Sequence, residues 1–393
     1  MISANGTSLL SRFVRNDKQA GLVMVVFGFL GFGAVNFPGT SAAYLAIAEF
    51  RIRLPLPHLD MTVSEWSQEG LLTLFFFIIG LDLRQEMATG FLKNPRNAVA
   101  PIFGAIGGVV LPVIMFMLIN LSSPSTMGGW AIPTATDIAF SLTILSMVSS
   151  RTLPRLKAFL LTLATVDDVI GIILIAFVYS HPSSILPLLI LCACLGIWFV
   201  ASRMRASSSI LLIFIAVGSW YAMLSAGIHP TLSGVAIGLL VPAKPLHEET
   251  TARAGRYRDL LSPLSALIAL PLFAFFAMGI PLGDVGGSTL KRPLFLGIVV
   301  GLVIGKPLGV LIMTGLCGLA GFNIGGGTHL SDIVGVAQLC GIGFTVSFLI
   351  SSLAFYDQNS IDLARLAVLV GSLLSCLLGS ITIKIGDLRN ASN

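Results

Sequence analysis

Long apolar runs separated by short polar connections dominate the chain. A helix that crosses a membrane needs about 20 mainly apolar residues, and about twelve such runs can be recognised. They cover residues 20–37, 68–87, 97–121, 129–149, 156–180, 184–202, 208–226, 230–243, 263–282, 293–317, 333–355 and 364–383. The pattern predicts an all-α polytopic membrane protein.

Composition favours lipid rather than water as the solvent. Apolar residues make up 55% of the 393 residues and charged residues only 10%, whereas soluble domains carry about 25% charged residues. The net charge of +5 does not indicate a nucleic-acid partner, because the basic residues stand in short loops between apolar runs. The five cysteines lie inside apolar runs without the spacing of a zinc site, so we expect them to be packing residues.

Basic residues are unevenly divided between the two sides of the predicted membrane. With the N-terminus in the cytoplasm, seventeen Lys and Arg fall on the inner side and five on the outer side. The inner set is Arg12, Arg15, Lys18, Arg84, Lys93, Arg96, Arg151, Arg155, Lys157, Arg203, Arg205, Lys244, Arg253, Arg256, Arg258, Lys384 and Arg389. The outer set is Arg51, Arg53, Lys291, Arg292 and Arg365. Because cytoplasmic loops carry the excess of Lys and Arg, both termini are predicted to be cytoplasmic, and the first run to be a retained helix.

Two connections are long enough to have structure of their own. Residues 41–65 form an outer segment, in which apolar and basic residues alternate from Phe50 to Leu54 and predict a strand or hairpin. Residues 244–262 form a charged inner connector. Otherwise we expect residues 1–393 to form a single membrane domain.

Four ionisable residues stand inside apolar runs, namely Asp137, Asp167, Asp168 and Lys306. A charge at mid-bilayer costs at least about 2.5–3.5 kcal/mol, so such residues must pair or line a watery cavity. An ion-pair network that only fixes helix packing is one explanation. Three acids against one base, however, leave negative charge that protons or a metal cation would neutralise.

The two adjacent acids cannot share one environment. Side chains of consecutive helical residues diverge by about 100°, so one of Asp167 and Asp168 can face an ion path while the other faces a neighbouring helix. Lys306 is the obvious partner for the acid that faces a neighbouring helix. Close carboxylates titrate as a coupled set, and such a site can release protons when a cation binds. Carboxylates and hydroxyls such as those of Thr134 and Thr136 favour a hard cation, which these residues alone do not identify further.

Two predicted spans are interrupted near their centres. In 129–149, Pro133 removes an intrahelical hydrogen bond, and in 333–355 two glycines, Gly341 and Gly343, weaken the helix. Paired interruptions in two halves of a chain indicate a transporter binding site. The alternative is the ordinary tolerance of Pro and Gly in membrane helices.

The interrupted stretches also resemble each other weakly, with Asp137 laid over Thr345. Helix ends carry partial charges, which Asp137 would neutralise at N-termini and Lys306 at C-termini. Glycines recur every four residues just before Lys306, and this spacing predicts a close helix approach that brings Lys306 near the aspartate helix. These glycines are Gly297, Gly301 and Gly305.

Six motifs carry a resemblance to a known family. They are Gly129–Pro133 with Thr136–Phe140, Ala164–Asp168, His229–Gly234, Leu270–Phe275, Gly305–Gly309 and Cys340–Thr345. On these motifs, which follow the family's order over nearly the whole chain, the sequence resembles the NhaA family of bacterial sodium/proton antiporters. The resemblance implies about twelve helices in inverted-topology repeats, with two interrupted helices crossing near mid-membrane.

The resemblance also implies an activity and a location. It implies a secondary active transporter of the cell inner membrane, rather than an enzyme, that works by alternating access without a cofactor. Na⁺, and Li⁺ as well, would leave the cell while more than one H⁺ enters, so that exchange is electrogenic and serves sodium and pH homeostasis. The segment 41–65 resembles the outer hairpin that joins two protomers of a homodimer in the lipid bilayer.

Residue roles follow from the same resemblance. Asp168 is expected to be the primary cation ligand, and Asp167 the proton-linked partner that can pair with Lys306. Asp137, with Thr136 beside it, would balance the helix ends. The candidates for pH sensing are Asp82, Arg84, Glu86 and His229. For His229, a purely structural role at a helix end is the alternative.

Other classes of protein stay open at this point. A sodium-coupled symporter of an organic anion would need a free cation at mid-membrane, and Lys306 is the candidate. An intramembrane aspartyl protease would need two acids converging from different helices, as Asp137 and Asp168 could. A homologue that acts as a sensor or scaffold would have no need of the intact pair of adjacent acids.

Overall fold

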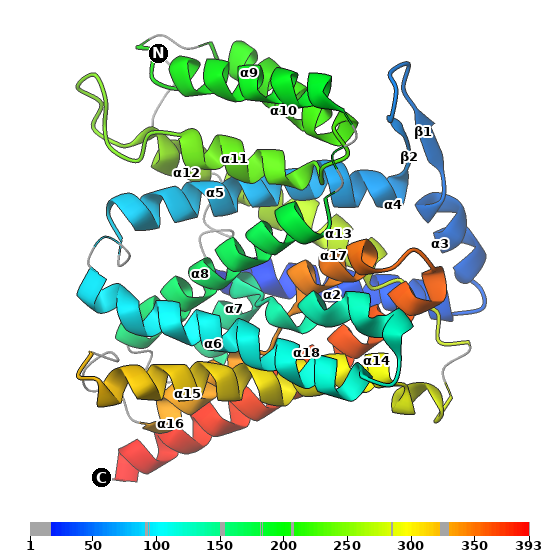
Figure 1. The fold of residues 1–393 in the computed structure, drawn as a ribbon, viewed down its shortest axis with the longest axis vertical. Coiled ribbons are helices and arrows are strands. Elements are labelled where there is room, and N and C mark those ends of the chain that lie inside the picture. The colour runs from blue at the N-terminus through cyan, green and yellow to red at the C-terminus, as the bar shows by residue number, and fades with distance from the viewer. Residues whose placement is uncertain are drawn as a thin grey trace. The chain divides into compact units, whose positions relative to one another are not determined.

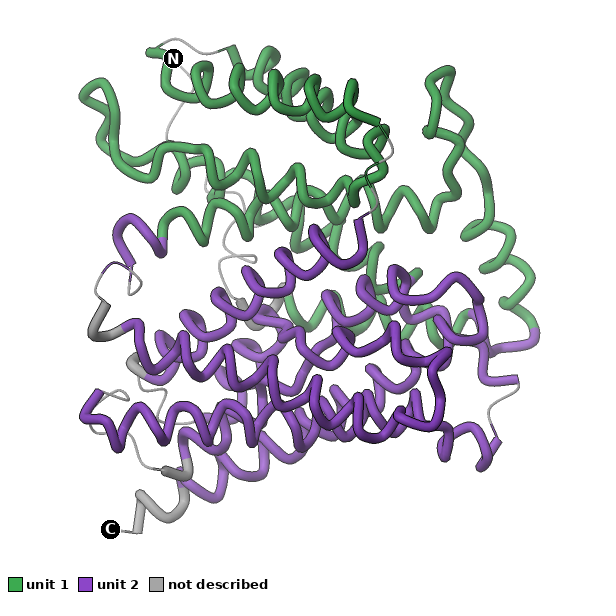
Figure 2. The backbone as a smooth tube through the Cα atoms, viewed as in Figure 1, with its two compact units in different colours: residues 1–34, 39–85, 181–276 green, residues 35–38, 86–180, 277–393 purple. Residues whose placement is uncertain are grey.

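The chain folds almost entirely into helices, as the apolar runs predict (Figure 1). This computed structural model describes residues 17–90, 93, 95–149, 154–180, 182, 184–205, 208–283, 286–322 and 330–392. The chain divides into two compact units (Figure 2). Unit 1 comprises residues 1–34, 39–85 and 181–276, and unit 2 comprises residues 35–38, 86–180 and 277–393.

Unit 1 contains, wholly or for the greater part, the following elements. They are α2 (Asp17–Asn36), α3 (Ser41–Ala48), β1 (Arg51–Arg53), β2 (Asp60–Thr62), α4 (Val63–Glu65), the π-helical η1 (Trp66–Leu71), α5 (Leu72–Ala88), α9 (Ile185–Ala201), α10 (Ser209–Ser225), α11 (Thr231–Leu240), α12 (Arg253–Leu264), the π-helical η4 (Ser265–Ala269) and α13 (Leu270–Ala277). Helices α9, α10 and α11 pack against one another.

Unit 2 holds the interrupted spans. Its elements are α6 (Pro95–Asn120), the 3₁₀-helical η3 (Pro124–Thr134), α7 (Ile138–Val148), α8 (Pro154–Val178), the 3₁₀-helical η5 (Thr289–Lys291), α14 (Pro293–Val300), the π-helical η6 (Gly301–Gly305), α15 (Lys306–Leu319), α16 (Leu330–Leu339), α17 (Phe344–Ala354) and α18 (Gln358–Ser392). Helix α6 packs against both α8 and α15, and α18 packs against α14, α16 and α17.

The predicted hairpin is present in residues 41–65. Strands β1 and β2 pair antiparallel with Ile52 opposite Met61, so the alternation of apolar and basic residues does reflect a strand. The first part of the segment is helical instead, because α3 precedes the hairpin. The capping box formed by Thr62 and Glu65 then starts the next helix.

Every predicted apolar run contains helix among the described residues. Six helices in the described part of the chain are long and apolar enough to cross a membrane, or up to eight if each of two bent pairs counts as one span. The helices α9, α10 and α11 are apolar but shorter. A multi-pass membrane protein is therefore supported, whereas the number of about twelve spans stays a prediction.

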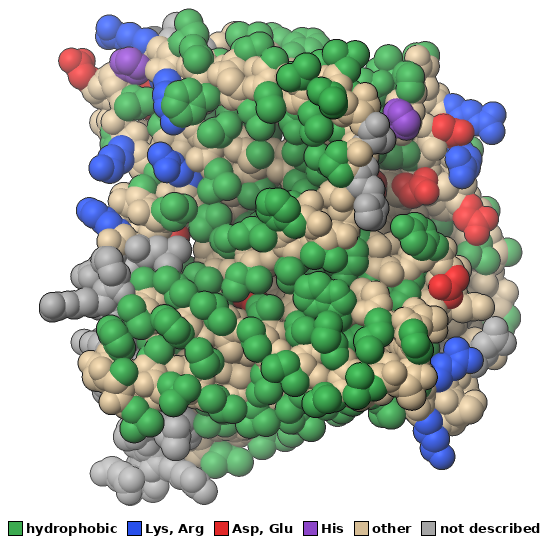
Figure 3. Space-filling model, viewed as in Figure 1, with side chains coloured by type: hydrophobic (Ala, Val, Ile, Leu, Met, Phe, Trp, Pro, Cys, Tyr) green, Lys and Arg blue, Asp and Glu red, His purple; other side chains and the backbone are tan. Residues whose placement is uncertain are grey.

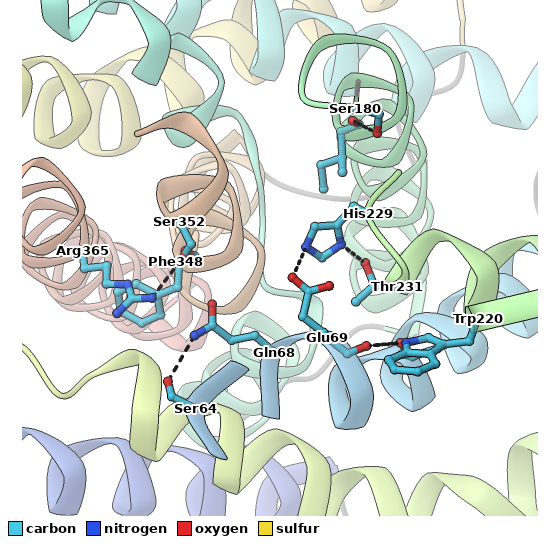
Figure 4. Close-up of polar contacts among 12 residues, drawn as sticks. Ser64, Gln68, Glu69, Ser180, Trp220, His229, Thr231, Phe348, Ser352 and Arg365 are labelled. Carbon is cyan, nitrogen blue, oxygen red and sulfur yellow. Dashed lines mark hydrogen bonds and ion pairs between the residues drawn. The ribbon is translucent and has the colours of Figure 1, made fainter. Parts of the chain in front are cut away.

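Two helices begin well before the apolar runs that predict them. Helix α12 begins at Arg253, inside the predicted connector, and α18 begins at Gln358. Arg365, assigned above to an outer connection, therefore lies within α18, where its side chain is buried and donates from Nη2 to Ser352 Oγ at 2.7 Å (Figure 4). Hydropathy misses the first turns of such helices because a helix can begin with polar residues before its apolar stretch.

The surface agrees with a lipid environment. On the face drawn in Figure 3, hydrophobic side chains cover much of the surface of both units. Many of the fully apolar side chains are exposed, for example Phe177 at 83% and Phe214 at 72%. Arg12, Arg15 and Arg151, which contribute to the predicted orientation, lie outside the described residues.

Candidate functional site

The first interrupted span breaks at three residues between η3 and α7. Pro133 offers no N–H to continue the helix, and η3 ends at Thr134, after which the backbone is extended at Ala135. Helix α7 begins after Asp137, whose Oδ1 accepts the N–H of Phe140 at 2.9 Å. A carboxylate at this position satisfies a free N–H group and complements the positive end of the helix.

The same carboxylate also caps the second interrupted span. Helix α16 ends at Leu339 and α17 begins at Phe344. Asp137 Oδ2 accepts the N–H of Thr345 at 3.2 Å, and the Asp137 N–H donates to Ile342 O at 2.7 Å. Asp137 is 2% exposed. One buried acid therefore accepts N–H groups at the N-terminal ends of two helices.

Hydroxyl groups tie the two breaks together in both directions. From the first span, Thr136 Oγ1 donates to Cys340 O at 2.8 Å and Ser141 Oγ to Leu339 O at 2.9 Å. From the second span, Ser347 Oγ donates to Ile132 O at 2.7 Å. Each broken helix thus supplies partners for the free end carbonyls of the other, which otherwise would lack hydrogen bonds.

Lys306 occupies the opposite electrostatic role. It follows the π-helical η6 and begins α15, and its side chain is fully buried. The ammonium Nζ donates to Thr134 O, an end carbonyl of η3, and to Asp167 Oδ2 at 2.6 Å. The lysine therefore neutralises a C-terminal helix end and forms a buried ion pair with α8.

The adjacent acids of α8 lie at this ion pair. Asp167 and Asp168 are 2% and 6% exposed. Asp167 Oδ1 is buried and accepts no hydrogen bond within the described residues, although its other oxygen binds Lys306. Acceptor capacity therefore remains on a carboxylate that is shielded from water. A proton or a cation is the kind of ligand that such an oxygen accepts.

The two acids of α8 do not belong to a larger cluster of metal-ligating side chains in the described part of the chain. Within the described residues, no group of three or more His, Cys, Asp or Glu side chains is placed to hold a metal ion. A cation at Asp167 or Asp168 would therefore be held by one or two carboxylates together with neutral oxygens.

The four candidates for pH sensing do not form one cluster. Asp82 Oδ1 pairs with Arg258 Nε at 2.5 Å, and Arg84 lies within electrostatic reach of Arg203. Both pairs belong to unit 1. In unit 2, Glu86 Oε1 accepts the hydroxyl of Thr162 on α8 at 3.3 Å. At the charged end of α5, Asp82 therefore has a partner on α12 within unit 1, and Glu86 has one on α8 within unit 2.

His229 belongs to a separate group in unit 1. Figure 4 shows its ring between the Glu69 carboxylate and the Thr231 hydroxyl. The distances are 3.6 Å from Nε2 to Glu69 Oε1 and 2.6 Å from Nδ1 to Thr231 Oγ1. Trp220 Nε1 donates to the backbone carbonyl of Glu69 at 2.8 Å. Sequence reasoning missed Glu69, although an acid at the start of an apolar run was a visible signal.

The fold and the site together define a class of protein. Interrupted apolar helices that meet at buried charges are the architecture of a secondary transporter in a membrane. The profile of the family described as Na⁺/H⁺ antiporter 1 matches residues 11–383. The chain belongs to this family, and it is therefore a transporter rather than an enzyme.

Individual relatives agree over most of their length. The chain is 39% identical over 396 residues to the Na⁺/H⁺ antiporter NhaA of Bifidobacterium breve, which covers 95% of this chain and 86% of the relative. It is 40% identical over 377 residues to the Na⁺/H⁺ antiporter NhaA of Nocardia farcinica, covering 95% and 90%. Among solved structures, the sodium proton antiporter MjNhaP1 of Methanocaldococcus jannaschii is similar in fold, with a TM-score of 0.52, 16% identity, and coverage of 94% and 91%.

Proposed function

We propose that the protein extrudes Na⁺, and Li⁺ as well, in exchange for entering protons, with Asp168 as the primary cation ligand and Asp167 as the proton-linked partner. The observation that carries this proposal is the buried pair of Lys306 and Asp167 at 2.6 Å, directly next to Asp168 in the chain. Membership of a sodium/proton antiporter family supports it.

Competition for the same oxygens couples the two ions. A cation and protons cannot occupy the sheltered carboxylates together, so binding of one displaces the other. Two acids that give up protons for one monovalent cation make more than one proton enter for each Na⁺ that leaves, and exchange is then electrogenic. Alternating access follows if the site opens to one side of the membrane at a time.

The surrounding charges support this chemistry without binding the cargo. Asp137 and Thr136 hold the two breaks together, and Lys306 balances the charge of Asp167 once its carboxyl group has given up its proton. Asp137 and Lys306 each bond to a helix end, and the Thr136 hydroxyl bonds to Cys340 O. The buried charges therefore stay compensated in a region with little water. We assign regulation by pH to Asp82, Arg84, Glu86 and His229.

The cellular setting completes the proposal. We place the protein in the plasma membrane with both termini in the cytoplasm, where it serves sodium and pH homeostasis. The hairpin of residues 41–65 would join two copies of the chain. Its apolar side chains at Ile52 and Leu54 are 38% and 44% exposed and would be available to a partner.

Exchange by purified protein in proteoliposomes tests the function. With an imposed pH gradient, external Na⁺ or Li⁺ should dissipate the gradient, and an added potassium conductance that clamps the voltage should speed the response. Asp168→Asn should abolish the response, and Asp167→Asn should abolish or cripple it. Asp60→Asn, which changes an exposed carboxylate of the hairpin, is the control and should match the wild type.

Two results would overturn the assignment. Exchange at the wild-type rate after both acids of α8 are neutralised would show that they do not carry the ions. A response that requires an organic anion in addition to Na⁺ would favour the symporter.

A further inference from the structure

Two buried hydroxyl groups precede the pair of acids on α8. Thr162 and Thr165 are 1% and 5% exposed. Thr165 stands three residues before Asp168, and Thr162 stands three residues before Thr165. Because residues three apart are neighbours on the surface of a helix, each hydroxyl lies one step closer to Asp168. At about 1.5 Å per residue, the series from Thr162 to Asp168 extends about 9 Å along the helix.

Both hydroxyl groups have already donated their protons. Thr165 Oγ1 donates to Leu161 O, one turn earlier on α8, at 2.7 Å. Thr162 Oγ1 donates to Glu86 Oε1, near the end of α5, at 3.3 Å. A threonine hydroxyl has one proton and two acceptor lone pairs. Once the proton has been donated, the oxygen can only accept, which suits a cation and does not suit an anion.

The series joins a carboxylate that water reaches to one that water barely reaches. Glu86 is partly exposed, whereas Asp168 is 6% exposed, and both belong to unit 2 together with the two threonines. A cation that moves from water to a buried site has to exchange its hydration shell for oxygens of the protein. Neutral oxygens between two acids allow this exchange to proceed stepwise.

A cation at the acids of α8 also needs neutral ligands when it is bound. Within the described residues, no group of three or more His, Cys, Asp or Glu side chains is placed to hold a metal ion. Hard cations take oxygen ligands, and one or two carboxylates do not complete their coordination. Thr165 carries the hydroxyl nearest to Asp168 in the sequence of α8.

We propose that Thr165 contributes its hydroxyl oxygen to the Na⁺ or Li⁺ ion held by Asp168, and that Thr162, oriented by Glu86, is a transient ligand of the ion as it enters from the cytoplasm. This inference rests on the exchange function and the orientation proposed above. It assigns one threonine to the binding site and the other to the path that leads to it.

A threonine in a membrane helix can also bond to its own backbone without any further role. Thr382 on α18 is an example, because its Oγ1 donates to Leu378 O at 2.8 Å and its side chain is partly exposed. Thr162 differs from this pattern, since its proton goes to a carboxylate on another helix. Thr382 is therefore the control position for the bond that Thr165 makes.

The first test removes the oxygen of Thr165 and keeps the shape of the side chain. In proteoliposomes at fixed pH, Thr165→Val should raise the Na⁺ or Li⁺ concentration that gives half-maximal exchange by roughly three- to tenfold, as expected for the loss of one polar contact. The maximal rate should change much less. Thr165→Ser keeps the oxygen and should stay within about twofold of the wild type. Thr382→Val should match the wild type.

The second test separates the path from the site by the side to which the ion is added. Everted membrane vesicles expose the cytoplasmic side to the medium, and right-side-out vesicles expose the outer side. Thr162→Val should raise the half-maximal Na⁺ concentration by roughly two- to threefold in everted vesicles only. Thr165→Val should raise it in both, because a ligand of the bound ion serves entry from either side.

Direct binding distinguishes a ligand from a residue that only supports the fold. Calorimetric titration of Li⁺ into the purified protein at fixed pH should show a Kd raised by the same factor in Thr165→Val and unchanged in Thr162→Val. A merely structural role would lower the unfolding temperature and the rate without moving the Kd. If Thr165→Val does not fold, Thr165→Ala lacks the same oxygen and should show the same rise.

The outcomes separate the two proposals. If the wild type exchanges ions but folded Thr165→Val keeps its half-maximal Na⁺ concentration and its Kd, the role of Thr165 is wrong and the exchange function stands. The same holds if Thr165→Ser is as impaired as Thr165→Val, because the oxygen would then not matter. Equal effects of Thr162→Val in both kinds of vesicle would exclude the entry path. A wild type without exchange would instead remove the proposed function.

Discussion

The protein handles charge in two contrasting ways. In unit 2, Lys306, Asp167 and Asp137 are at most 2% exposed, and the lysine and Asp137 bond directly to helix ends. In unit 1, the pair of Arg51 and Asp60 on the hairpin is 52% exposed on both side chains. Between these limits, Arg253 is buried but binds Glu249, whose side chain is 19% exposed.

The contrast shows that geometry alone does not determine what an ion pair contributes. A buried charge whose partner is removed stays in a medium of low dielectric, whereas an exposed charge is screened by water and salt. Substitutions in these pairs should therefore differ in their effect on the free energy of unfolding far more than the pairs differ in donor–acceptor distance. Each of the following substitutions tests one step of that order.

The largest effect is expected at Lys306. Lys306→Met leaves the Asp167 carboxylate without its cation and Thr134 O without its donor, which should destabilise the protein by about 3–5 kcal/mol. The apparent unfolding temperature in detergent measures this. The double variant Lys306→Met/Asp167→Asn removes both charges and should recover much of the loss. A single variant as stable as the wild type would contradict the burial argument.

Asp137 should come next. Asp137→Asn keeps an acceptor for one helix end but turns an NH₂ group toward the other and removes the charge. The expected loss is roughly 1.5–3 kcal/mol, measured by the same unfolding assay. Asp357→Asn is the matched control, because Asp357 is an exposed cap that accepts one N–H, from Ser360, at 2.8 Å. If Asp137→Asn and Asp357→Asn lower the unfolding temperature equally, burial and the second helix do not add to the stabilising effect of Asp137.

A smaller, pH-dependent effect is expected at Glu249. Hydrogen bonding by Arg253 holds the pKa of the Glu249 carboxyl below its ordinary value. A depressed carboxyl pKa stabilises the folded protein above the ordinary titration range, and this contribution is lost as the pH falls through the depressed pKa. Glu249→Gln should therefore reduce the drop in unfolding temperature between about pH 7 and about pH 3.

The neighbouring Glu248→Gln provides the comparison for that experiment. Glu248 is exposed, so this variant should keep the wild-type response to acid. If the two glutamine variants respond alike, Arg253 does not couple Glu249 to folding.

The smallest effect is expected at the hairpin. Asp60→Asn should change stability by about 0–1 kcal/mol, since both partners are half exposed. Any difference from the wild type should vanish at high salt, because screening removes what remains of the attraction. An effect as large as that of Asp137→Asn would break the proposed order.

Much of the fold could be predicted because hydropathy directly reports which segments prefer lipid. The positions of both helix breaks also followed from local chemistry, at Pro133 and at the glycines beside Cys340. The closeness of Lys306 and the aspartate helix could be predicted for a different reason. Few charges occur inside apolar runs, so few pairings were available.

Other features were not visible in the sequence because they depend on contacts between distant segments. The bonds of Ser141 and Ser347 to the opposite break are one example. When the two interrupted stretches are aligned with Asp137 over Thr345, Ser347 aligns with Ala139 rather than with Ser141. The weak resemblance between the stretches therefore does not predict which serines form these hydrogen bonds. The pairing of Glu69 with His229 is another, since nothing local brings a residue that precedes α11 to η1.

The partnership between Ser347 and Ile132 has a consequence for biosynthesis. These residues are 215 positions apart, so the ribosome completes the first broken helix long before its hydrogen-bonding partner exists. During that interval the nascent chain holds free peptide groups, and Asp137 has only its own helix α7 to cap. Because unpaired peptide groups are costly in lipid, we expect the first broken helix to reach its final position in the bilayer only after the second has been synthesised.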